Sequence, residues 1–197
     1  MLYTGMRVGE VTGLTKNDIL EDDISVNHTL VYYDKRTDKS NKMTYSINST
    51  KTEAGKRMVL ILPQVREALD LEDDYLEKAE IKRKAVVDGY TDFVFVNRFG
   101  ENLNQGTLNK ALRRIARDYN LQEIDKAKEE RREALLLPKI STHTLRHTFA
   151  TRMMEKGVNL KVMQDTLGHS DIRVTLEIYT EVQKDFRKDE LNKLSDL

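Results

Sequence analysis

The chain of 197 residues has no cysteine and no tryptophan, and it contains only two prolines. Without cysteine it can form neither disulfides nor thiolate metal sites, and it cannot use a cysteine nucleophile. No apolar run approaches the roughly 20 residues that cross a bilayer, and no secretory signal opens the sequence. These absences lead us to expect a cytoplasmic protein with no membrane partner.

The chain also lacks an excess of charge of either sign. Charged residues make up 34% of the chain, but 33 basic and 33 acidic side chains cancel to a formal net charge of zero. This balance argues against a protein that coats DNA through its overall charge, while it leaves room for a local basic groove. The length fits one domain. Because the opening MLYTGMRVGEVTGL reads as the middle of a helical unit, we expect a single domain over residues 1–197, cut from a longer chain.

The apolar pattern predicts a mainly α fold with a small three-stranded antiparallel β-sheet, an α+β class. The strands are expected over 24–34, 43–48 and 57–62, with Gly55 in the turn of the last hairpin. A short extended piece is expected over 92–97. Helical spacing covers the remaining segments: 6–14, 63–85, 104–119, a charged insertion over 121–138, and then 141–156, 159–167, 171–179 and 183–195. In the helix over 104–119 four side chains should face inward: Leu108, Leu112, Ile115 and Tyr119.

The stretch STHTLRHTFA allows two chemical interpretations. His143 and His147 lie four residues apart, so they would share a helix face, and His169 could join them as a third zinc ligand. Arg146 between them brings a positive charge that disfavours a metal, and the glutamate base of a metalloprotease helix is missing. A phosphate explains more, because the planar fork of an arginine matches two phosphate oxygens and stays charged. We therefore expect no metal and no cofactor, with His147 in a supporting role.

A tyrosine follows His169 by ten residues, in RVTLEIYT. Tyrosine is a weak nucleophile at neutral pH, since its unperturbed pKa is about 10. Arginines that bind a phosphate would polarise the phosphorus and also favour the phenolate. The chain has eight tyrosines, so composition does not select Tyr179. The order and spacing of the whole set select it.

Several of these motifs together resemble one family. THTLRHTFAT, MQDTLGHSD and TLEIYT are similar to the C-terminal half of tyrosine recombinases, the family of phage and conjugative-transposon integrases. YTGMRVGEVTGL resembles their first arginine motif, with Arg7 in the catalytic position and Glu10 as its structural partner. STKTEAGKR resembles their β-hairpin, where Lys51 matches the catalytic lysine and Lys56 is the weaker candidate. The motifs keep the order of the family from Arg7 to Tyr179.

The resemblance implies the tyrosine-recombinase catalytic-domain fold and a metal-independent breaking and rejoining of DNA. The implied catalytic residues are Arg7, Lys51, His143, Arg146, His169 and Tyr179. The tyrosine would attack a backbone phosphate and form a 3′-phosphotyrosyl link, while the two arginines stabilise the developing charge. The lysine would protonate the 5′-oxygen. His169 would donate a hydrogen bond to a non-bridging oxygen, and His143 would accept the tyrosine proton or orient the cluster.

The resemblance also implies partners. These are double-stranded DNA at specific recombination sites, further copies of the chain, four in the active synapse, and accessory proteins that bend DNA or set direction. Six basic residues are candidates for phosphate contacts, with an ordinary solvated helix surface as the alternative for about half of them: Lys110, Arg113, Arg114, Arg117, Arg152 and Lys161. The core-binding domain that precedes the catalytic domain in the family is not part of the chain. The segment 183–197 is expected to be a helix that docks on a neighbouring protomer or packs on its own domain.

Three alternatives from other classes stay open. A non-enzymatic helix-turn-helix module fits the rhythm of ATRMMEKGVNLKVMQDTLGHSDIRVTLEIY, with Gly157 and Gly168 at the turns. It leaves Arg7, Lys51 and Tyr179 unexplained. A type IB topoisomerase uses much the same chemistry, and a metal-dependent hydrolase would need the histidines as ligands.

Overall fold

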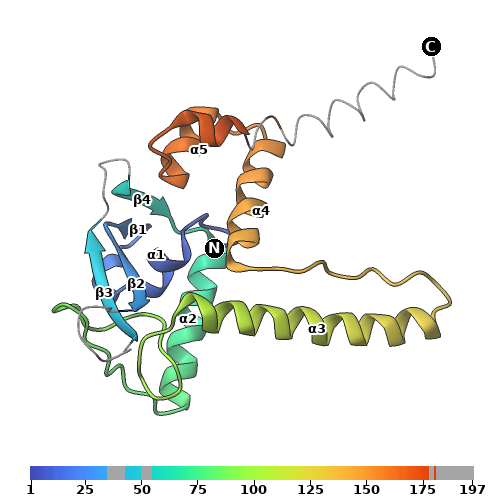
Figure 1. The fold of residues 1–197 in the computed structure, drawn as a ribbon, viewed down its shortest axis with the longest axis horizontal. Helices are drawn as coiled ribbons and strands as arrows, with labels where there is room; N and C mark the ends of the chain where they lie inside the picture. Colours follow the sequence, from blue (N-terminus) through green and yellow to red (C-terminus); the bar gives the residue numbers. More distant parts are fainter. Residues whose placement is uncertain (35–42, 50–54, 178–179, 181–197) are drawn as a thin grey trace.

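The computed structural model describes residues 1–34, 43–49, 55–177 and 180. In chain order the elements are α1 (Val8–Gly13), a 3-10 turn (Lys16–Asp18), β1 (Asp23–Val26), β2 (His28–Asp34), β3 (Met43–Ser49), β4 (Arg57–Leu60), α2 (Pro63–Lys78), α3 (Gln105–Glu129), α4 (Thr142–Glu155) and α5 (Leu160–Leu167). Figure 1 shows the strands with α1 and α2 on one side, α4 and α5 on the other, and a long α3 that leads away from both. The predicted combination of many helices with little sheet is confirmed.

The strands form two separate two-stranded antiparallel sheets, β1 with β4 and β2 with β3, so the predicted three-stranded sheet is wrong in this detail. The predicted strand 24–34 is one extended segment that changes its partner at Asn27. The side chain of Asn27 is held at this point by Asp18 and Ser25, each at 3.1 Å. Alternate side chains stay buried across the break: Ile24, Val26, His28 and Leu30. A pattern of period two predicts an extended segment, but it does not reveal a change of partner.

The second helix begins at Pro63, as predicted, but it ends at Lys78 instead of 85. Glu80 adopts a positive φ of 53°. The N–H of Ile81 then donates to the carbonyl of Leu76 at 2.9 Å, which is a common way for a helix to end. A glycine usually marks such an end in a sequence, and none stands here.

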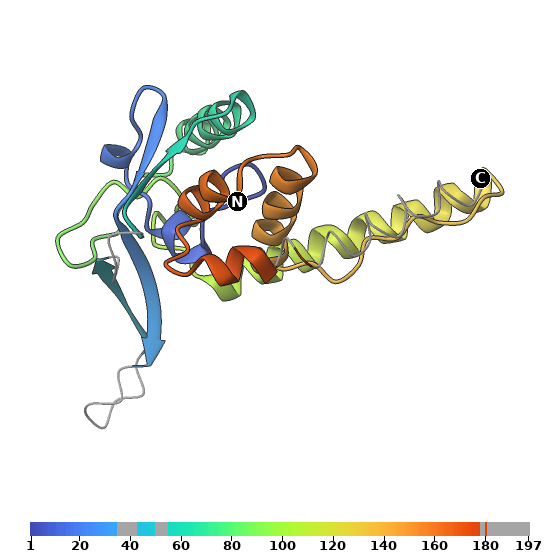
Figure 2. The same cartoon turned by 90° about the horizontal axis from the view of Figure 1, so that it is seen from above.

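The third helix runs without a break from the helix predicted over 104–119 into the insertion predicted as helical over 121–138, but it ends at Glu129, so the prediction is wrong for residues 130–138. Its second half and the returning chain project from the rest of the molecule, as Figures 1 and 2 show; Figure 2 gives the view from above. We call residues 120–140 the arm. Ile115 and Tyr119 were predicted to face inward, but they are 58% and 43% exposed. The buried residues of this part of α3 are Ala116, Glu123 and Ala127, so the helix packs on a different face from the predicted one.

Two apolar clusters hold the strands and the neighbouring helices together. The first consists of Met6, Leu14, Ile24, Val26, Val59, Leu69 and Val94. The second consists of Leu30, Leu76, Ala85, Val87, Phe93 and Val96. Because Met6 and Leu14 flank α1 at its two ends, the first cluster fixes this short helix, and with it the position of Arg7.

The fourth and fifth helices agree with the predicted stretches 141–156 and 159–167. Gly157 and Gly168 follow them with φ of 69° and 64°, the left-handed backbone that glycine adopts easily. Residues 172–177 are helical, whereas the helix predicted over 183–195 lies outside the described residues. Within the described ranges, no helix combines the length and the hydrophobicity of a membrane span.

Candidate active site

Arg7 directly precedes α1 and is held by the first turn of that helix. Its backbone N–H donates to the Glu10 carboxylate at 2.7 Å, and its Nη1 donates to the same carboxylate at 3.1 Å. Its Nη2 donates to the carbonyl of Gly168 at 3.0 Å. The side chain is nevertheless 45% exposed, so part of the guanidinium faces solvent. Glu10 has the supporting position that the sequence predicts.

Arg146 lies on the buried face of α4 and is only 8% exposed. Its Nη1 donates to the carbonyl of Gly5, and its Nη2 donates to the carbonyl of Leu167 at 2.6 Å. Burial, and then the nearby positive charge of Arg7, lower the pKa of Arg146 to about 10. The group therefore stays protonated at neutral pH, and α4 carries a buried cation that backbone carbonyls hold in place.

Two of the carbonyls that accept from Arg7 and Arg146 belong to glycines in left-handed conformation, Gly5 and Gly168. Gly5 has a φ of +60°, and a Cβ there would lie 2.5 Å from the ring of Phe149. A side chain at position 5 would push α4 away from the chain that precedes α1. Gly168 caps the C-terminus of α5. Both glycines therefore set how closely the segments of Arg7 and Arg146 approach each other.

His169 forms a hydrogen bond through each ring nitrogen. Nε2 lies 2.9 Å from Nη2 of Arg146, and Nδ1 lies 2.9 Å from the hydroxyl of Thr175. Arginine can only donate, so Nε2 accepts and the proton of the ring sits on Nδ1. Burial, followed by the charges of Arg146 and Arg7, lowers the pKa of His169 to about 4. The imidazole is neutral at pH 7. For His169 to donate to a phosphate through Nε2, this nitrogen has to leave Arg146 and gain a proton.

The two histidines of α4 lie beside the buried arginine. His143 and His147 are exposed, with ring centroids 5.4 Å apart in an edge-to-face arrangement. Together with Arg146 and His169 they line a hollow of 220 Å³. The sequence predicted this grouping of histidines around one arginine. In the part of the chain that the structure describes, no three His, Asp or Glu side chains are grouped so that they could hold a metal ion.

Lys51 and Tyr179 lie outside the described residues, so their positions stay predictions. Described residues near them in the sequence contact the same region of the molecule. Gly55 accepts a hydrogen bond from Nη1 of Arg57 at 3.4 Å, and Glu177 lines the hollow beside the histidines.

Sequence reasoning missed Arg57, the first residue of β4. Its Nη1 and Nη2 donate to Oε1 and Oε2 of Glu10 at 3.0 Å and 2.8 Å, and its Nε donates to the carbonyl of Thr166 at 2.7 Å. The side chain is 6% exposed. Burial raises the pKa of Glu10, but the hydrogen bonds and charges of Arg57 and Arg7 outweigh it, and the net shift is downward. One signal was available: Arg57 is the only charged residue in the apolar run RMVLIL, and a charge there calls for a partner.

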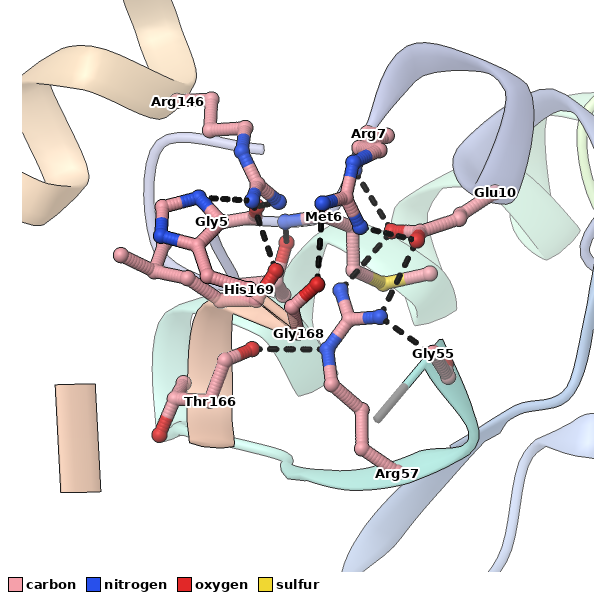
Figure 3. Close-up of polar contacts among 12 residues, drawn as sticks. Gly5, Met6, Arg7, Glu10, Gly55, Arg57, Arg146, Thr166, Gly168 and His169 are labelled. Carbon is pink, nitrogen blue, oxygen red and sulfur yellow. Dashed lines mark hydrogen bonds and ion pairs between the residues drawn. The ribbon is translucent and has the colours of Figure 1, made fainter. Parts of the chain in front are cut away.

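The end of α5 presents three successive carbonyls, each to a different arginine, and Figure 3 shows the three arginines with Thr166 and Gly168. Thr166 accepts from Arg57, Leu167 from Arg146, and Gly168 from Arg7. The last carbonyls of a helix lack partners and carry partial negative charge, so they suit cations. Three guanidinium groups and the carboxylate of Glu10 leave a net charge of two positive units in this cluster. Such a cluster can bind a phosphate and stabilise further negative charge on it.

The six basic residues predicted to touch DNA are all exposed, on α3, α4 and α5. Some of them have acidic neighbours. Arg117 pairs with Asp118 at 2.8 Å, and Lys161 pairs with Asp165 at 2.8 Å. Exposure agrees with a DNA contact and equally with an ordinary solvated surface, so these six contacts stay predictions.

Comparison with known proteins gives one consistent result. The model of the phage integrase family matches residues 1–185. The transposase from transposon Tn916 of Enterococcus faecalis is 31% identical over 195 residues, which are 99% of this chain and 44% of that protein. The tyrosine recombinase XerD of Halalkalibacterium halodurans is 33% identical over 190 residues, which are 96% of this chain and 50% of that protein.

Among solved structures, the Tn1549 transposon integrase in complex with transposon right end DNA superposes with a TM-score of 0.74 and 29% identity. The match covers 98% of this chain and 56% of that one. This likeness confirms the predicted fold class. The chain spans about half the length of the curated relatives that it matches.

Proposed function

The chain belongs to the phage integrase family, and from this premise we propose that it is the strand-cleaving domain of a tyrosine-type site-specific DNA recombinase. The observation that carries the proposal is the convergence of Arg7 and Arg146 beside His169, from opposite ends of the sequence. The net positive charge of this cluster suits a phosphodiester.

The proposed reaction exchanges one phosphodiester for another. The hydroxyl oxygen of Tyr179 attacks phosphorus and passes its proton to His143, the bond to the 5′-oxygen breaks, and Lys51 gives a proton to that oxygen. The products are a 3′-phosphotyrosyl link and a free 5′-hydroxyl. The 5′-hydroxyl of the exchanged strand then attacks the link, releases Tyr179 and joins the DNA strand. Arg7 and Arg146 stabilise the charge on the non-bridging oxygens while phosphorus has five ligands. Neither water nor a metal ion is a reactant.

The proposed substrate is double-stranded DNA at specific recombination sites of a mobile element. Two observations support DNA as the substrate: the chain resembles the Tn916 transposase along 99% of its length, and the similar Tn1549 integrase was solved with transposon DNA. The exposed basic residues on α3, α4 and α5 are candidates for contacts that position the duplex. A tetramer in the synapse and accessory proteins that bend DNA or set direction complete the proposal.

A covalent trap tests the reaction. The chain, and any longer protein that its gene encodes, is offered nicked half-sites built from the DNA that flanks the gene. We expect an adduct on a denaturing gel and, by mass spectrometry, a nucleotide on Tyr179. The adduct should disappear in Tyr179→Phe and persist in Tyr119→Phe, a control at an exposed tyrosine of α3.

Other outcomes point to the rival functions. Tight DNA binding without an adduct, on several candidate half-sites, would favour a DNA-binding module that does not cleave. Relaxation of supercoiled plasmids that lack the flanking sites would favour a type IB topoisomerase. Loss of cleavage on addition of a chelator would favour a metal-dependent hydrolase.

A further inference from the structure

We propose that Arg57 is a positioning residue: it neutralises Glu10 and so leaves the charge of Arg7 available to the DNA phosphate. The inference rests on the proposed function of the site. It assigns a role to a buried arginine that the six predicted catalytic residues do not include.

Arg57 and Arg7 both donate hydrogen bonds to the Glu10 carboxylate, and together they occupy all of its acceptor positions. Arg57 donates to both oxygens, at 3.0 Å and 2.8 Å. Arg7 adds one side-chain bond at 3.1 Å and one backbone bond at 2.7 Å. Each oxygen thus accepts two bonds, which fills its two lone pairs. Arg7 is therefore held to Glu10 by one nitrogen of its fork, and its Nη2 turns to Gly168 instead.

Exposure separates the roles of the two arginines. The side chain of Arg57 is 6% exposed, and that of Arg7 is 45% exposed. All three guanidinium nitrogens of Arg57 already donate to Glu10, Thr166 or Gly55. Arg57 is thus not placed to touch DNA directly, whereas Arg7 has free surface. Any effect of Arg57 on the reaction must therefore pass through its neighbours.

Removal of the Arg57 charge should change the cluster in two ways. Each oxygen of Glu10 loses one donor, and Arg7 can then close a two-point ion pair with the carboxylate, which is the preferred geometry for arginine and carboxylate. Its Nη2 would leave Gly168. The net charge of the cluster also falls from two units to one, and so does its attraction for the transition state.

The rate of adduct formation under saturating DNA measures the effect. We expect Arg57→Gln to slow cleavage at least about tenfold while DNA binding changes little, because the loss falls on transition-state stabilisation. Glu10→Gln combined with Arg57→Gln should cleave faster than Arg57→Gln alone, since the charge that captures Arg7 is gone. Arg132→Gln is the matched control, because Arg132 also forms a two-point pair with a glutamate, Glu123, but on the arm.

A purely structural role predicts a different pattern. If Arg57 only ties β4 to α5, the double variant is at least as impaired as Arg57→Gln, because it restores no contact. That result, or a wild-type rate in Arg57→Gln, would overturn the proposal. Should Arg57→Gln not fold, Arg57→Lys carries the test. A lysine gives up the two-point geometry but keeps the charge on which the proposal depends, so we expect a rate within about threefold of wild type, and a loss of about a hundredfold would contradict the proposal.

A second readout needs no DNA. Burial, and then the positive charges of Arg146, Arg7 and Arg57, hold the pKa of His169 below its ordinary value. An NMR titration of His169 should therefore show a higher pKa in Arg57→Gln and a return toward wild type in the double variant. If wild type forms no adduct but His169 responds in this way, the proposed recombinase function fails while the charge role of Arg57 stands. If wild type cleaves and His169 does not respond, the charge role fails alone.

Discussion

Two charge clusters of opposite composition lie in different regions of the molecule. At the site one carboxylate, Glu10, accepts from two guanidinium groups, those of Arg57 and Arg7. On the arm one guanidinium, that of Arg132, donates to two carboxylates, those of Glu123 and Glu130. The first group of three has one net positive charge and the second has one net negative charge. Only the first suits a phosphate.

The two clusters also differ in what they connect. In the sequence, Arg57 lies 47 positions after Glu10 and 109 positions before Thr166, and it contacts both. Arg132 and Glu123 are nine positions apart and close the arm on itself, where Glu123 also accepts from the backbone of Leu135 at 2.9 Å. The same type of ion pair therefore joins distant parts of the fold in one region and shapes a single projection in the other.

Glu10→Gln should have the largest effect on stability and tests the comparison most directly. The Glu10 side chain is 4% exposed, and its removal leaves Arg57 as a buried, unpaired charge. Loss of one partner from a buried pair costs about 3–5 kcal/mol, so the free energy of unfolding in urea should fall by about 3 kcal/mol. Glu123→Gln on the arm is the matched control. Equal stability of the two variants would show that the connection between distant segments does not matter.

Acid should weaken the site through His169, and the arm has no histidine. The pKa of His169 is about 4 in the fold and about 6.5 when the chain is unfolded. The unfolded chain therefore takes up this proton first, so the stabilisation is complete above pH 6.5 and is lost as the pH falls toward 4. Since His169 is only half-buried, we expect a loss of about 1–2 kcal/mol.

Urea unfolding between pH 7 and pH 4.5 measures this loss. In His169→Gln the part of the pH dependence that belongs to this residue should disappear. An unchanged pH dependence in that variant would mean that the cluster does not repel the proton of His169.

Arg132→Gln should have the smallest effect. The hydrogen bond to Arg132 is the largest cause that lowers the pKa of Glu123, to about 2, but solvent surrounds the arm and screens the pair. We expect a change in melting temperature of less than about 2 °C and faster hydrogen exchange at Leu135 and Leu137, whose N–H groups bind arm side chains. Slower exchange, or a large loss of stability, would mean that the arm supports the core after all.

The parts of the site that the sequence predicted have local signals. Arg7 and Glu10 are three positions apart, and His143, Arg146 and His147 lie within five positions on one helix. Spacing alone can group such residues. The side-chain partner of Arg57, Glu10, and the carbonyl of Thr166 are distant in the sequence and approach it only after the chain has folded. The same reason explains the partner change at Asn27 and the exposed arm, since both depend on what packs nearby and not on the pattern of the segment itself.

The three carbonyls at the end of α5 have a consequence for protein synthesis. Arg7 is made early, and its partner Gly168 follows 161 positions later. At about 5–20 residues per second, several seconds pass between the two on the ribosome. During this time Arg7 and Arg57 have no helix end to bind, so the phosphate site cannot form. A nascent or prematurely terminated chain thus carries positive side chains without an assembled centre, and the proposed DNA cleavage requires molecules whose translation has passed this helix.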